Sequence, residues 1–101
     1  MDMGGRRAEL DAKIALWERE LEQLRVALAN ASDALNAKHH PTFVDLYRHK
    51  EVVKSRWEAI RGVYRPAAEA VQRCDEALIA MEAAWGAAQG MLAEVRAAYR
   101  P

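Results

Sequence analysis

The sequence contains little of what disulfide-bonded, membrane or nucleic-acid-binding proteins need. Its 101 residues include one cysteine, one phenylalanine and three prolines, and 15 basic side chains are balanced by 15 acidic ones. A single cysteine excludes a disulfide within the chain and is consistent with a reducing compartment. The balanced charge provides no global attraction to nucleic acid or to an anionic membrane.

Long apolar runs are also missing. The segment poorest in charge, 77–93, still contains Glu82 and Gln89, and it is shorter than the roughly 20 apolar residues that a membrane-spanning helix needs. The first seven residues are not followed by the apolar stretch of a secretory signal peptide. We therefore expect a cytoplasmic protein that does not bind membranes, with residues 1–5 disordered.

Helix-forming residues dominate the composition, and apolar residues recur at alternating steps of four and three. This spacing is the a/d pattern of a coiled coil, in which one side of a helix packs against partner helices. The first series consists of Leu10, Ile14, Trp17, Leu21, Leu24, Leu28, Ala31 and Leu35. The later series consists of Phe43, Leu46, Val53, Trp57, Ile60, Tyr64, Ala67, Val71, Cys74, Leu78, Met81, Trp85, Ala88, Leu92, Val95 and Tyr99. The chain is therefore predicted to be all-α.

Pro41 is predicted to separate the first two helices. A proline disfavours a helical conformation of the residue before it, and Thr42 with Asp45 forms a pattern like a capping box. We therefore expect helices over 6–38 and 42–61, joined by a short turn that makes them antiparallel.

The segment 62–66 leaves two architectures open. Gly62 can end a helix and Pro66 can begin the next one, which predicts a third helix over 66–100 and an antiparallel, coiled-coil-like three-helix bundle. Alternatively, the second helix continues and is kinked near Pro66, which gives a helical hairpin.

We favour the bundle, as a single helical domain over 6–101. Small residues beside the last a/d series widen its apolar face, and a wide face needs two neighbouring helices. One of those neighbours can come from a second chain, so we expect an oligomer, with a homodimer as the simplest form.

Motifs for catalysis or metal binding are missing. His39, His40 and His49 show neither His-x-x-x-His nor Glu-x-x-His spacing, and the first two are expected in a solvated loop. Cys74 occupies a d position and is interpreted as a buried side chain rather than a nucleophile. No glycine-rich phosphate loop is present. We therefore expect no enzymatic activity, no metal and no cofactor.

Charge is distributed unevenly along the chain. The segment 38–65 has seven basic and three acidic residues, whereas 1–37 and 66–101 each have two more acidic than basic residues. One interpretation is that the basic middle helix packs against acidic neighbours. The other is an exposed basic face that binds phosphate or an acidic protein. The candidate partner-binding residues on this helix are Arg48, Lys54, Arg56, Arg61 and Arg65.

Tryptophans at a and d positions can be either core residues or anchors for a partner, so Trp57 and Trp85 are also candidates. Lys50 interrupts the series at an a position, and we expect its ammonium group to reach water. The sequence thus predicts a non-enzymatic protein–protein interaction module: a small adaptor, assembly factor, chaperone or inhibitor that self-associates and docks a protein partner. The alternative is a binder of nucleic acid or an acidic surface through the basic helix at 48–65.

Overall fold

The computed structural model describes the backbone of residues 3–98 and the side chains of residues 6–98. These residues form four helices: α1 (Met3–Ala29), α2 (Asp33–Arg61), α3 (Ala68–Ala87) and α4 (Gln89–Ala98). No residue from 3 to 98 lies in a strand, and the prediction of an all-α protein is confirmed to that extent.

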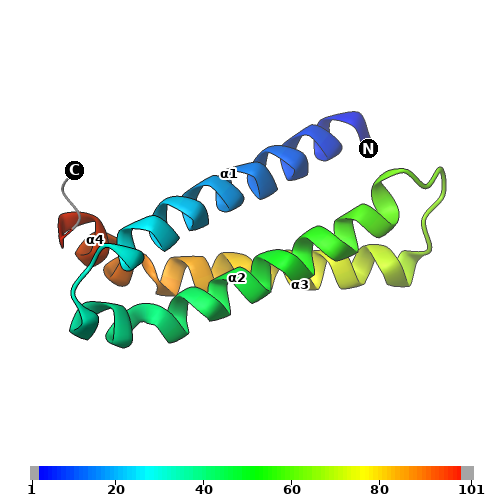
Figure 1. Cartoon of the computed structure of the whole chain (residues 1–101). Helices are drawn as coiled ribbons and strands as arrows, with labels where there is room; N and C mark the ends of the chain where they lie inside the picture. Colours follow the sequence, from blue (N-terminus) through cyan, green and yellow to red (C-terminus); the bar gives the residue numbers. More distant parts are fainter. Residues whose placement is uncertain (1–2, 99–101) are drawn as a thin grey trace.

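The helices form an elongated molecule of 49 × 22 × 17 Å. The chain reverses direction between α1 and α2 and again between α2 and α3, so that α2 runs antiparallel to both (Figure 1). The short helix α4 lies at the same end of the molecule as the turn between α1 and α2, where it contacts α1.

Two clusters of buried apolar side chains join the helices. The first consists of Leu10, Ile14, Trp17, Val53, Trp57, Ile60, Cys74, Ala77 and Met81. The second consists of Leu21, Leu24, Ala27, Leu28, Leu46, Ala88, Met91, Leu92 and Val95. Trp85 packs against both clusters. All of these residues except Ala27, Ala77 and Met91 belong to the predicted a/d series. Burying each large apolar side chain contributes about 2 kcal/mol to the stability of the fold.

The turn between the first two helices comes nine residues earlier than predicted. α1 ends at Ala29 rather than at residue 38, and the Ser32 hydroxyl accepts a hydrogen bond from the Leu35 N–H at 3.2 Å as the N-cap of α2. The Asn30 side chain donates to the Val26 carbonyl at 2.8 Å. Serine and asparagine satisfy unpaired backbone groups at helix ends, and these two residues outweigh the effect of Pro41.

Pro41 lies inside α2, so the predicted boundaries at 38 and 42 are wrong. A proline in a helix interior removes one backbone hydrogen bond and costs about 3 kcal/mol. The helix continues because residues on both sides of Pro41, including the buried His39 and Leu46, pack against the rest of the molecule. The two histidines expected in a loop, His39 and His40, are therefore helical.

The segment between Arg61 and Ala68 is a loop, so the alternative of a continuous helix kinked near Pro66 is wrong. Gly62 is the C-cap of α2, and its backbone N–H donates to the Ile60 carbonyl. Tyr64, which the a/d pattern placed in the core, is 92% exposed because the chain has already left the helix.

The predicted helix over 66–100 is interrupted once. α3 ends at Ala87 and α4 begins at Gln89, while the backbone N–H of Ala88 still donates to the Ala84 carbonyl at 3.1 Å. Residues 99–100 of that prediction lie outside the described residues. Residues 1–2 of the segment 1–5, which was expected to be disordered, also lie outside the described residues. Met3 is the first residue of α1.

Candidate partner-binding surfaces

Two of the four basic candidates on α2 form ion pairs with α1. Lys54 Nζ donates to Glu18 Oε2 at 3.1 Å, and Arg61 Nη2 donates to Asp11 Oδ2 at 2.8 Å. The hydrogen bond from Lys54 to Glu18 raises the pKa of the Lys54 ammonium group. Both cations are thus already paired within the chain.

The two tryptophan candidates are also held within the molecule. Trp57 is 3% exposed, and its indole Nε1–H donates to Asp11 Oδ1 at 2.8 Å. Trp85 is partly buried between the two core clusters. The structure therefore places both residues at contacts between helices.

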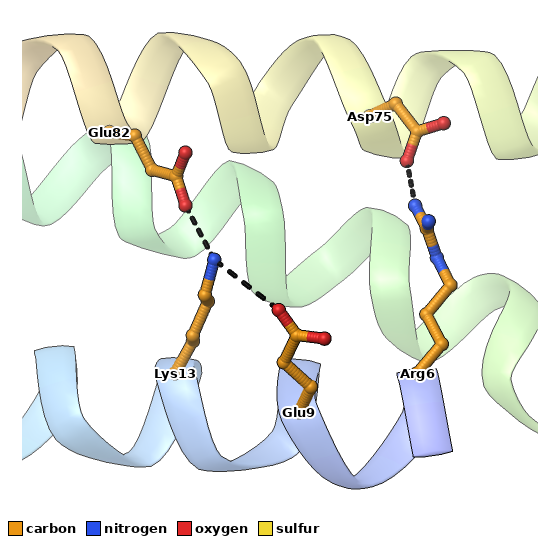
Figure 2. A network of polar contacts seen from close by, with 5 residues as sticks. All are labelled: Arg6, Glu9, Lys13, Asp75 and Glu82. Carbon is orange, nitrogen blue, oxygen red and sulfur yellow. Dashed lines mark hydrogen bonds and ion pairs between the residues drawn. The ribbon is translucent and has the colours of Figure 1, made fainter. Parts of the chain in front are cut away.

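Ion pairs also connect α1 to α3, as Figure 2 shows. The Arg6 guanidinium pairs with Asp75, and Lys13 Nζ donates to Glu82 Oε1 at 2.7 Å while lying 3.8 Å from Glu9 Oε1. The hydrogen bond to Glu82 raises the pKa of Lys13. These pairs connect α1 to α3 at two places along the helices.

The other two basic candidates on α2, Arg48 and Arg56, line hollows between α2 and α3. One hollow of about 360 Å³ is lined by Arg56, Ala59, Ile60, Ala70, Arg73 and Glu76. A second of about 270 Å³ is lined by Arg48, His49, Val52, Arg56, Glu76, Ala77 and Ala80. Because Arg56 and Glu76 line both hollows, the two hollows adjoin, and together we call them the α2/α3 groove.

The arginines of the α2/α3 groove are only lightly engaged. Arg48 Nη2 donates to Asp45 Oδ1 at 2.7 Å, one turn away on the same helix, and this bond lowers the pKa of Asp45. Arg56 Nη1 crosses to α3 and donates to the Arg73 carbonyl at 3.0 Å. Among the carboxylates of residues 6–98, none forms an ion pair with Arg56. The groove is thus lined by guanidinium groups that can accept new anionic partners.

Arg65, the last basic candidate, lies apart from this groove. Its Cζ is 5.6 Å from the centre of the Tyr64 ring in the loop between α2 and α3. The structure therefore brings together Arg48 and Arg56 with Arg73, which was not among the candidate residues predicted from the sequence. The period of α3 could have identified Arg73, since it shares a face with Ala70 and Ala77.

Two polar side chains, Lys50 and His39, are buried, although the sequence pattern predicted that both reach water. Lys50 is 3% exposed, and its Nζ lies 4.1 Å from the centre of the Tyr47 ring and bonds to Glu51. His39 is buried with Nε2 3.2 Å from Glu94 Oε2, although the geometry is not that of a hydrogen bond. The earlier turn at Ser32 explains why His39 is buried, because this turn places His39 within α2, where it lies beside Glu94 of α4.

No arrangement of three metal-ligating side chains occurs within the described part of the chain. Cys74 is buried, and this burial raises the pKa of its thiol, which disfavours the reactive thiolate. None of the described helices is long and apolar enough to cross a membrane.

A further hollow lies between α1 and α4. Its volume is about 420 Å³, and the apolar side chains of Leu24, Ala27, Leu92 and Val95 contribute to its lining. Glu20 on α1 and Arg96 on α4 form an ion pair beside it. Glu22 also lines it, so its ionised side chains carry one net negative charge.

No protein-family model matches this chain, and neither a curated protein nor a solved structure is found to resemble it. Inferences about its function therefore rest on the surfaces of this molecule.

Proposed function

We propose that this chain is a non-enzymatic protein–protein interaction module, which acts as a small adaptor, assembly factor, chaperone or inhibitor. The α2/α3 groove is the observation that carries this proposal. The side chains that line it come from α2 and α3 and not from α1. It combines small apolar residues with guanidinium groups that can still donate further hydrogen bonds. This combination suits the binding of a protein segment.

The buried cluster that α2 and α3 share supports this proposal, because packed side chains on both helices hold them together. Lys54 ties α2 to α1 through Glu18, and Lys13 ties α1 to α3 through Glu82. A surface that is already rigid loses less conformational entropy when a partner binds. The groove is therefore suited to recognition without prior rearrangement.

We also propose that the coiled-coil-like three-helix bundle is the working architecture and that copies of it associate. Several large apolar side chains are exposed on the helices and on the loop after α2, and those residues are Leu16, Val44, Tyr47, Val52, Val63, Tyr64 and Ile79. Contact between copies would remove part of this apolar area from water.

Two measurements test the proposal. Sedimentation velocity over a series of micromolar concentrations is expected to show association, and a strict monomer throughout would remove the self-association. Capture from a lysate of the source cells is expected to retain a protein with the wild-type chain and to lose it with Ala80→Trp, which fills the α2/α3 groove. Equal capture by both forms would contradict docking in this groove.

Binding of nucleic acid through 48–65 is the alternative. It is less supported because Lys54 and Arg61 are paired with carboxylates of α1, which leaves fewer free cations to neutralise phosphates. A salt titration with duplex DNA separates the two functions, since absence of binding at low salt eliminates the alternative.

A further inference from the structure

We infer that the α2/α3 groove binds an acidic amphipathic helix of a protein partner. This inference rests on the proposed function and names the chemistry of the partner. Three arginines and one glutamate line the groove, so its ionised side chains carry two net positive charges when His49 is neutral. A partner with carboxylates along its flanks is complementary to that charge.

The length of the groove suits a helix of about three turns. On α2 the lining residues Arg48, Val52, Arg56 and Ala59 follow one another at steps of four, four and three, which places them on one face. At 1.5 Å per residue they extend over roughly 17 Å. A partner helix of similar length can lie along the groove and present its apolar stripe to α2 and α3.

The apolar part of the groove determines how close that helix can approach. Ala59 on α2 and Ala70, Ala77 and Ala80 on α3 have small side chains, whereas Val52 contributes a larger apolar contact. Small residues at a contact allow two helices to pack closely. The floor of the groove thus accommodates apolar side chains, while the charges act at its sides.

The arginines can supply specificity for carboxylates. A guanidinium group binds a carboxylate with two parallel hydrogen bonds, and Arg56 has no such partner among the described side chains. Arg48 and Arg73 are paired with Asp45 and Glu69 of their own helices in exposed positions. Because exposed pairs within one helix contribute little stability, both arginines can turn to a docked partner.

The same observations argue against a phosphate backbone as the occupant. Nucleic-acid affinity comes mainly from neutralising phosphates, whereas this groove includes Glu76 and an apolar floor. These features favour a protein helix as the occupant, and binding of nucleic acid in the groove would contradict the inference.

The test uses two synthetic peptides of about three to four helical turns with the same apolar stripe of leucine and alanine. One has glutamates on its flanks and the other has lysines at the same positions. Titration of the full-length, isotope-labelled protein followed by NMR is expected to show shifts for the acidic peptide, confined to residues that line the α2/α3 groove. Shifts elsewhere, no shifts, or equal binding of the lysine peptide would overturn the inference.

Two charge reversals provide the matched comparison. Arg56→Glu is expected to weaken binding of the acidic peptide by about tenfold, as expected for loss of one charge-assisted contact. Arg19→Glu makes the same change of charge at an exposed position of α1 that does not line the groove, and it is expected to leave binding unchanged. If both variants weakened binding equally, the effect would come from the net charge of the protein and not from the groove, and the inference would be overturned.

The outcome also separates this inference from the proposed function. If a cellular partner is lost with Ala80→Trp but retained with Arg56→Glu, the chain is an interaction module whose partner is not acidic. If duplex DNA binds in the groove of the wild-type chain and this binding is lost in the Arg56→Glu variant, the acidic helix is excluded and the nucleic-acid alternative is supported.

Discussion

The indole of Trp57 on α2 and the carboxylate of Asp11 on α1 are joined by a hydrogen bond of 2.8 Å, and the second oxygen of that carboxylate accepts from Arg61 at 2.8 Å. One acidic side chain thus satisfies a buried indole N–H and an arginine one turn further along α2. A buried tryptophan usually needs such a partner. This contact fixes the position of α1 along α2 more specifically than apolar packing alone.

Asp11→Ala is therefore expected to destabilise the protein by about 1–3 kcal/mol, because the buried indole N–H loses its acceptor. Urea unfolding followed by tryptophan fluorescence measures the change. Glu9→Ala is the control, since Glu9 is exposed and lies 3.8 Å from Lys13 on the same helix, and it is expected to cost less than about 0.5 kcal/mol. Equal losses for the two variants would contradict a special role for Asp11.

The position of the first turn can be tested with two hydroxyl residues. Ser32→Ala is expected to cost about 1 kcal/mol, because the N-cap of α2 loses the acceptor for the Leu35 N–H. Thr42→Ala, at the cap that the sequence pattern predicted, is expected to change stability by less than about 0.5 kcal/mol. Thermal unfolding measures the loss of stability in both variants. A larger loss for Thr42→Ala than for Ser32→Ala would support a turn at residues 39–42 instead.

Pro41→Ala is expected to stabilise the protein. The substitution restores the backbone donor and removes the ring from the interior of α2, while the greater freedom of the unfolded chain offsets part of the gain. The net increase in the free energy of unfolding is expected to be about 2 kcal/mol. A loss of stability instead would show that the chain needs an interruption at Pro41.

Stability is expected to depend on Glu94 at acidic pH. The hydrogen bond from Lys38, together with the nearby His39, lowers the pKa of the Glu94 carboxyl below its usual 4.5. A lowered pKa in the folded state means that the ionised group stabilises the fold above pH 4.5, and this contribution is lost as the pH falls through the lowered value.

Glu94→Gln is thus expected to reduce the unfolding temperature at neutral pH, and its difference from the wild type should disappear at acidic pH. Glu58→Gln is the control, because Glu58 forms no ion pair with the described side chains, and it is expected to have little effect at either pH. A constant difference between Glu94→Gln and the wild type across this pH range would contradict the role of the Glu94 charge.

The a/d series was sufficient to predict the helical class and most of the core. Leu21, Met81 and Val95 are almost completely buried as the pattern requires, because a repeat of about 3.5 residues places apolar side chains on one face whatever the partner is. The pattern failed at Tyr64, where the chain departs from the helix. Periodicity describes a face but carries no information about where a helix ends.

The sequence by itself determined that this protein is helical and which apolar faces are buried, because both follow from local spacing. Only the tertiary structure decided that the first turn is capped by Ser32, that Lys54 and Arg61 pair with α1, and that Arg48, Arg56 and Arg73 share one groove. Such partnerships depend on the rotation and offset of one helix against another. Those quantities arise from the packing of residues that are far apart in the chain.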